Sequence, residues 1–263
     1  MFHTILIPHR DRNAHLEWCL WSIERSAQAT GIYDFQVIIV DAESEFEPEP
    51  PVRGMVVHDQ NHGHLFSKVR CYNVGMALSC RAGGVVTFLD ADAIVGRRWL
   101  EAARCLAANS LTRLCYRVWL LPVTELDGIT ASNRELAATD WFAKCERTYV
   151  PAGEFYGNTD DIYTGPDPPP PFGPHVFGNS QCTMRWDTLG DLEYHDGFVG
   201  RGREDQWFAR EVWRRAGDAY CGALMTHPDF AMLHISDPRP MTEDDGWNNL
   251  AANESNKRLY EET

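Results

Sequence analysis

The alternation of apolar strands with a helix near the start of the chain most constrains its fold. Residues 4–7 form a short apolar run that Pro8 stops, and residues 35–40 form a second run of β-branched and aromatic side chains. Between these runs, apolar residues recur at helical spacing from Asn13 until Gly31. Such a strand–helix–strand unit joins two parallel strands through a right-handed crossover. The chain is therefore predicted to be an α/β protein built on a mostly parallel sheet.

The same alternation continues further along the chain. Asn73 is predicted to cap a helix that the pair Gly83 and Gly84 ends. Residues 151–176 contain four consecutive prolines, which cannot form the interior of a helix or sheet, so an extended surface loop is predicted there. Further strands are expected at residues 55–57, 85–89, 114–121 and 232–235, and further helices at 99–108, at 136–147 and from Glu204 onward.

The composition is that of a globular protein without a nucleic-acid-coating surface. The 263 residues are 44% hydrophobic and 24% charged, which is ample for a core. The net charge of −14 disfavours phosphate neutralisation along DNA or RNA, and also contact with an anionic membrane. A local basic pocket for a small anionic ligand is compatible with this charge.

The cysteines and the first residues favour a cytoplasmic protein. The eight cysteines are scattered without any Cys-x-x-Cys pair and mostly fall inside apolar patterns, so we interpret them as reduced core residues. The chain enters its first strand without the charged and apolar regions of a signal peptide. No apolar run approaches the roughly 20 residues that cross a bilayer, so no membrane span is expected.

Two carboxylates stand at the end of the apolar run at residues 85–89. Asp90 and Asp92 are separated by one alanine, and ligands of α/β proteins bind at the carboxyl ends of strands. Two aspartates at this spacing can turn toward one hard cation, which prefers oxygen ligands. Taken alone, a solvated turn is also a reasonable interpretation of the same residues.

Other charged residues also follow predicted strands. Arg10 and Arg12 come after the first strand, Asp41 after the second, and Glu204 and Asp205 after a glycine-rich turn. Loops that follow parallel strands share one edge of the sheet, so these side chains are expected to converge near Asp90 and Asp92. A pocket of this kind suits a diphosphate held through a divalent cation, which also stabilises diphosphate as a leaving group.

Several segments in a fixed order carry a family resemblance. They are residues 7–12 followed by 15–16, residues 40–44, residues 66–70 with 73–75, residues 88–92, residues 177–180 and residues 200–205. Together they resemble the GT-A-fold glycosyltransferases, with features of the family 2 inverting enzymes and of the β-1,4-galactosyltransferase-like group. The resemblance covers most of residues 4–240, and it implies a GT-A (Rossmann-like) domain with a mixed, mostly parallel central sheet flanked by helices.

The resemblance also implies a division of the single domain, residues 1–263, into two halves. Residues 1–125 would bind a nucleotide-sugar donor, in particular a UDP-sugar, and residues 126–263 would bind the acceptor. Asp41 is similar to an aspartate that meets the uracil base, and Asp90 would reach the ribose or the sugar. The implied donor-binding residues are Pro8, Arg10, Arg12, Asp41, Lys68, Arg70 and Asp90.

The metal and catalytic residues follow from the same resemblance. Asp92, His234 and Asp90 would hold Mn²⁺ or Mg²⁺. Asp205 would be the base that deprotonates the acceptor hydroxyl, and Glu204 would position the acceptor. Each has a plain alternative: His234 in an apolar strand is often a core residue, and acids are favoured in the first turn of any helix.

Two positions depart from the pattern of the galactosyltransferase-like group. Arg201 stands where an aromatic residue usually follows the first glycine of the acceptor signature, and Ala231 stands where a methionine usually precedes the metal-binding histidine. The acceptor therefore stays open: a glycan, a protein side chain, a small molecule and a modified base all offer hydroxyls.

The sequence thus predicts a metal-dependent, inverting hexosyl- or N-acetylhexosaminyltransferase. A metal-dependent nucleotidyltransferase is the alternative enzyme, although it normally carries a glycine-rich, lysine-containing loop after its first strand, where this chain has Pro8, His9 and Arg10. A non-catalytic sugar- or partner-binding protein is the second alternative.

Overall fold

A seven-stranded mixed sheet forms the centre of the computed structural model, which describes residues 2–60, 65–79, 84–108, 111–116, 118–147, 181–200, 203–217, 222–225, 227–236 and 250–263. Four of its neighbouring pairs are parallel and two, both involving β8, are antiparallel, which confirms a mixed, mostly parallel sheet. In sheet order the strands are β3 (Gly54–His58), β2 (Phe35–Asp41), β1 (His3–His9), β4 (Val85–Phe88), β8 (Cys182–Arg185), β6 (Arg113–Tyr116) and β9 (Gly222–Met225).

A second, three-stranded sheet has the order β5 (Ala93–Val95), β10 (Met232–Ser236) and β7 (Val118–Pro122). The prediction of one strand over residues 114–121 was wrong, because this stretch supplies β6 to the first sheet and β7 to the second. A run of apolar residues gives no sign of where a chain leaves one sheet for another. The second sheet matters for function because β5 starts immediately after Asp92.

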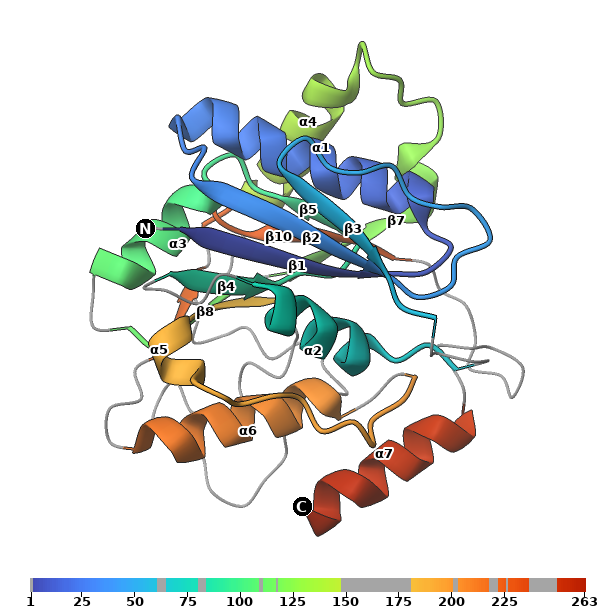
Figure 1. The fold of residues 1–263 in the computed structure, drawn as a ribbon. Helices are drawn as coiled ribbons and strands as arrows, with labels where there is room; N and C mark the ends of the chain where they lie inside the picture. Colours follow the sequence, from blue (N-terminus) through green and yellow to red (C-terminus); the bar gives the residue numbers. More distant parts are fainter. Residues whose placement is uncertain are drawn as a thin grey trace.

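Helices cover both faces of the seven-stranded sheet (Figure 1). Alternate residues of β1 and β2 face opposite sides: Ile5 packs with α1 (Asn13–Thr30) and α3 (Trp99–Ala108), whereas Leu6 packs with α2 (Lys68–Leu78) and α6 (Glu204–Ala216). The remaining helices are η1 (Val123–Leu126), α4 (Arg134–Arg147), α5 (Trp186–Leu189) and α7 (Leu250–Glu262). Among the described residues, no helix is long and apolar enough to span a membrane.

The start of α2 differs from the prediction. Ser67, not Asn73, is the N-cap, and its hydroxyl accepts a hydrogen bond from the backbone N–H of Arg70 at 3.3 Å. Asn73 lies inside the helix, where its amide donates to the Tyr194 carbonyl at 2.9 Å and accepts from the Tyr194 N–H at 2.8 Å. The cap prediction failed because Asn73 serves a distant backbone segment instead of its own helix.

Three predicted features cannot be compared with the structure. The proline-rich loop at residues 151–176, residues 177–180 of the acceptor signature and Arg201 all lie outside the described residues. The division into a donor half and an acceptor half stays a prediction.

Candidate active site

The parallel strands of the large sheet end at one edge, as their order along the chain predicted. His9 pairs with Asp41, Asp41 pairs with His58, and Leu6 pairs with Phe88. The residues that follow β1, β2, β3 and β4 therefore lie next to one another. In open α/β sheets this edge is where ligands bind.

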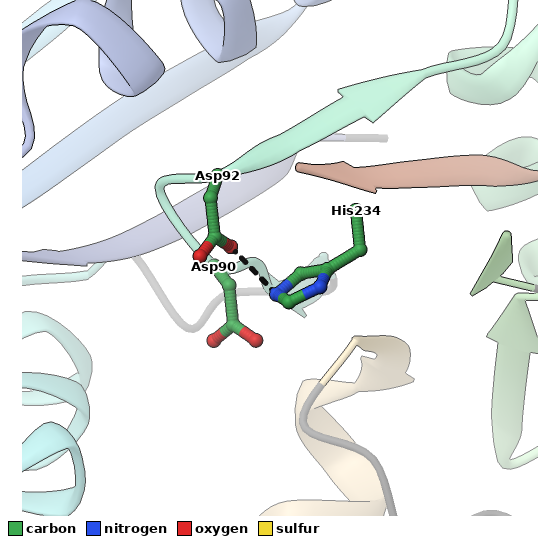
Figure 2. Close-up of side chains that lie close together, drawn as sticks. All are labelled: Asp90, Asp92 and His234. Atoms are coloured by element: carbon green, nitrogen blue, oxygen red, sulfur yellow. Dashed lines mark ion pairs between the residues drawn. The ribbon is translucent and has the colours of Figure 1, made fainter. Parts of the chain in front are cut away.

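Asp90, Asp92 and His234 form a cluster at this edge (Figure 2). One ligand atom from each residue lies within 4.8 Å of the others. The second sheet creates the cluster, because β10 pairs with β5 and places His234 opposite Ala93, the residue after Asp92. His234 Nε2 lies 3.1 Å from Asp92 Oδ1.

The oxygen Asp92 Oδ1 is suited to a cation. It is buried, and within the described part of the chain it has no partner in hydrogen-bond geometry, despite its closeness to His234. A buried carboxylate oxygen that accepts no well-aligned hydrogen bond is stabilised when a group from outside the chain binds it. Two carboxylates and one imidazole form a ligand set that accepts Mn²⁺ or Mg²⁺. The residues present therefore fit the expected metal.

Charged neighbours keep Asp92 ionised. Burial alone would raise the pKa of Asp92, but His234 and the guanidinium of Arg12, which forms an ion pair with it, lower that pKa to about 2. Burial alone would lower the pKa of His234, but Asp92 and Asp90 raise it above its usual value. Asp92 is therefore an anion over the whole physiological pH range.

Asp90 accepts hydrogen bonds from two side chains and forms an ion pair with a third. The Tyr72 hydroxyl lies 3.3 Å from Oδ1, the Gln181 amide nitrogen 3.4 Å from Oδ2, and the Lys68 ammonium 3.8 Å from Oδ1. Tyr72 and Gln181 were not among the predicted site residues. A buried tyrosine in a helix and a glutamine before a strand give no local sequence signal for such a role.

The acids that begin α6 meet Lys68. Its Nζ lies 3.1 Å from Glu204 Oε1 and 3.3 Å from Asp205 Oδ2. Packing fixes the helix here, since Phe208 stacks on Tyr194 with ring centroids 3.8 Å apart. Asp205 Oδ1 is buried and has no hydrogen-bond partner among the described residues.

Burial and neighbouring charges shift the pKa values of Asp205 and Lys68. Burial raises the pKa of Asp205 to about 7; Lys68 opposes this shift, whereas Glu204 and Asp90 add to it. Burial alone would lower the pKa of Lys68, but Asp205, Asp90 and Glu204 raise it above its usual value. Lys68 is therefore a permanent cation, and Asp205 titrates near neutral pH, as a general base requires.

Asp41 lies at the same edge but in a separate group. Its Oδ1 lies 2.8 Å from His9 Nδ1 and accepts a hydrogen bond from the Ser44 hydroxyl at 2.5 Å, and its Oδ2 lies 3.5 Å from His58 Nδ1. Burial alone would raise the pKa of Asp41, but the hydrogen bonds from His9 and Ser44 lower it. His9 was not predicted as a site residue.

The remaining predicted donor residues lie around these two groups. Pro8 is buried in β1 beside Val40, and Arg10 lies in the following loop near Asp11 at 4.0 Å. Arg70 pairs with Asp59, with Nε 2.6 Å from Oδ2. The structure thus brings Arg12, Lys68, Asp90, Asp92, Glu204, Asp205 and His234 together and leaves Arg70 outside that set.

Comparison with known proteins agrees with this architecture. By sequence, the chain matches no protein-family model and no curated protein. By structure, it is similar to S. aureus TarS 1–349 in complex with UDP-GlcNAc, with a TM-score of 0.57 and 13% identity over 91% of this chain and 60% of that one. It is also similar to the mannosyltransferase PcManGT from Pyrobaculum calidifontis in complex with GDP-Man and Mn²⁺, with a TM-score of 0.55 and 15% identity over 90% of this chain and 57% of that one.

The chain has the GT-A fold. This conclusion confirms the fold that the sequence motifs predicted, and one of the structural neighbours is a mannosyltransferase. At such low identity the likeness concerns the fold alone. The chain spans about three-fifths of the length of the neighbours named above.

Proposed function

We propose that this protein is a metal-dependent, inverting glycosyltransferase. It transfers a hexosyl or N-acetylhexosaminyl group from a nucleotide sugar, in particular a UDP-sugar, to a hydroxyl acceptor. One observation carries this proposal: Asp90, Asp92 and His234, whose ligand atoms lie close enough to share one cation, are at the same sheet edge as Asp205, a carboxylate whose pKa is raised to about 7. UDP-GlcNAc in TarS and GDP-Man with Mn²⁺ in PcManGT support the donor class.

The donor would lie along the ends of β1, β2 and β4. Asp92, His234 and Asp90 would hold Mn²⁺ or Mg²⁺, which when bound neutralises a diphosphate and supports its departure. Asp41 would contact the base, and Arg12 and Arg10 would contact the nucleotide. Of the other residues that the sequence motifs assign to the donor, Pro8 is buried in β1 and Arg70 is paired with Asp59.

The chemical step needs one base. In the proposed reaction the bond between the anomeric carbon and the nucleotide diphosphate breaks, and a bond from that carbon to the acceptor oxygen forms. The acceptor hydroxyl loses its proton to Asp205, whose Oδ1 has no hydrogen-bond partner among the residues that the structure describes. Glu204 would position the acceptor. The nucleoside diphosphate leaves with the electron pair of the broken bond.

Two other functions make different predictions. A nucleotidyltransferase would release pyrophosphate from a nucleoside triphosphate, and the chain lacks the glycine-rich, lysine-containing loop after β1 that such enzymes normally use. A non-catalytic sugar-binding protein would bind a nucleotide sugar without ever hydrolysing it. The expected cytoplasmic location also stays a prediction.

A panel of nucleotide sugars tests the proposal. Calorimetric binding with and without Mn²⁺, followed by slow hydrolysis with water as acceptor, should single out one donor that binds only with the metal. Asp187→Asn, which removes an exposed ion pair with Arg185, serves as the matched control and should behave like the unmodified protein. Absence of Mn²⁺-dependent binding for every nucleotide sugar would reject the proposal.

A further inference from the structure

The surroundings of Lys68 differ from those expected of a lysine that contacts a donor phosphate. The sequence motif suggests a basic nucleotide contact, which requires an ammonium group open to the ligand. In the structure only 6% of the Lys68 side chain is exposed. Its ammonium lies against carboxylates of this chain: Glu204 at 3.1 Å, Asp205 at 3.3 Å and Asp90 at 3.8 Å.

These three acids come from two distant parts of the chain. Asp90 follows β4 and belongs to the proposed metal and donor site, whereas Glu204 and Asp205 begin α6 and belong to the proposed acceptor side. Lys68 is the first residue of α2 and contacts both groups. It is therefore the point at which the two sides of the site are joined.

The segment that carries Lys68 is itself fixed to the region before α6. The Ser67 hydroxyl donates a hydrogen bond to the Phe198 carbonyl at 3.2 Å, and the Gly200 N–H donates to the Phe66 carbonyl at 2.8 Å. These bonds tie the start of α2 to the turn that leads into α6. The two residues that precede Lys68 are thus fixed to this turn, while its own ammonium group contacts the acids.

The charge pattern explains why a cation is needed at this point. Asp90, Glu204 and Asp205 would repel one another if they were brought together without a positive charge between them. An ammonium group has three N–H donors and can turn them toward several acceptors, which a planar guanidinium cannot do in the same space. Lys68 therefore stabilises a carboxylate arrangement that would otherwise spread apart.

We propose that Lys68 is a positioning residue that holds Asp205 and Glu204 in place for the transfer step and links them to Asp90, instead of binding the donor diphosphate. This inference rests on the proposed function, because it assigns Lys68 a role in that reaction. It departs from the donor contact that the sequence motif suggests, and the two roles predict different kinetic effects.

Substitution of Lys68 by methionine tests the difference. In Lys68→Met, slow hydrolysis of the preferred UDP-sugar should fall by about 100-fold, the effect of misplacing a reacting group by roughly 1 Å. Calorimetric affinity for UDP with Mn²⁺ should stay within about twofold, since the lost contact is not with the donor. Lys144→Met, which removes an exposed lysine near Glu125, is the control and should change neither quantity.

Lys68→Arg covers the possibility that Lys68→Met does not fold. Arginine keeps the positive charge but changes its shape, so this variant should fold, bind UDP with Mn²⁺ and still turn over more slowly than the unmodified protein. Unchanged turnover in Lys68→Arg and in folded Lys68→Met would overturn the inference. So would a loss of UDP affinity as large as the loss of turnover, because that result identifies a donor contact.

A measurement without substrate separates this inference from the proposed function. If the unmodified protein hydrolyses no nucleotide sugar, the proposed function fails, but the contact can still be tested by thermal unfolding. The effects of Lys68→Met and Asp205→Asn on the unfolding temperature should then be coupled: the second substitution should change it differently once the first is present. Additive effects would show that Lys68 does not hold Asp205, and would overturn the inference independently.

Discussion

This molecule has two groups of buried polar side chains, and they differ in whether other residues of the chain supply all of their hydrogen-bond partners. The first, the sheet network, crosses β1, β4, β8 and β6. His3 Nε2 lies 2.7 Å from the Thr87 hydroxyl, which lies 2.5 Å from the Thr183 hydroxyl, and the Tyr116 hydroxyl lies 2.5 Å from Thr183. Burial lowers the pKa of His3 to about 3, so this network is neutral at physiological pH.

The second group lies at the sheet edge and is charged. Three of its buried oxygens have no hydrogen-bond partner in the part of the chain that the structure describes: Asp92 Oδ1, Asp205 Oδ1 and Gln181 Oε1. An unpaired buried acceptor costs about 1–3 kcal/mol. The side chains of the sheet network hydrogen-bond to one another and stabilise the fold. The edge group instead has oxygens that a cation and the hydroxyl groups of a ligand can bind.

The largest expected effect tests the edge group. Asp205→Asn should lower slow hydrolysis of the preferred UDP-sugar by about 1000-fold, the scale of a lost general base, while UDP still binds with Mn²⁺. Glu211→Gln, on the surface of the same helix, is the control. Unchanged turnover in Asp205→Asn would show that Asp205 is not the base.

Asp205→Asn also changes stability in a pH-dependent way. Because the pKa of Asp205 is raised to about 7 in the folded protein, the native protein loses stability as pH rises from the ordinary carboxyl pKa to about 7, where the loss is complete. The variant should therefore gain more thermal stability at pH 8 than at pH 5, where the native residue is already protonated. Equal changes at both pH values would contradict the assigned pKa.

The next effect concerns the proposed metal ligand. Asp92→Asn keeps the shape of the side chain but removes the charge that makes it a strong ligand, so UDP affinity in the presence of Mn²⁺ should fall by about 100-fold. Affinity without the metal should be unchanged. Titration calorimetry measures both values. A UDP affinity that responds to Mn²⁺ as strongly in the variant as in the native protein would remove Asp92 from the site.

A third effect follows from the ionisation of the base. Asp205 must be ionised to accept a proton, so kcat/KM should fall about tenfold for each pH unit below its pKa of about 7. Above that pH the profile should level off until another group titrates. A flat profile between pH 5 and 8 would mean that no group titrating near 7 takes part in the reaction.

The smallest effect tests the sheet network. Thr183→Val removes the hydroxyl that joins Thr87 and Tyr116, and should lower the free energy of unfolding by about 1–3 kcal/mol. Turnover of the UDP-sugar should be unchanged. Thr188→Val, at a surface threonine of α5, is the matched control. A loss of turnover without a loss of stability would show that the sheet network also serves the site.

Much of the fold could be predicted because its signals are local. Helix α3 spans residues 99–108 as its apolar spacing indicated, and Gly31 and Gly217 stand at the ends of their helices in left-handed or positive-φ geometry. The acids after β2 and β4 lie at one edge because parallel strands bring their carboxyl ends together. None of these features depends on which distant side chain each residue contacts.

The partners of the site residues depend on long-range pairing, which periodicity and spacing do not reveal; only the family resemblance placed His234 with Asp92. His234 meets Asp92 only because β10 joins β5 in a second sheet, which no periodicity predicted. Lys68 faces Glu204 and Asp205 because α2 and α6 cover the same face of the large sheet. Burial and neighbouring charge also set the pKa of Asp205, and both arise only when the chain is folded. Residue types and their order thus indicated where ligands bind, whereas three-dimensional packing assigned each charged group its partner.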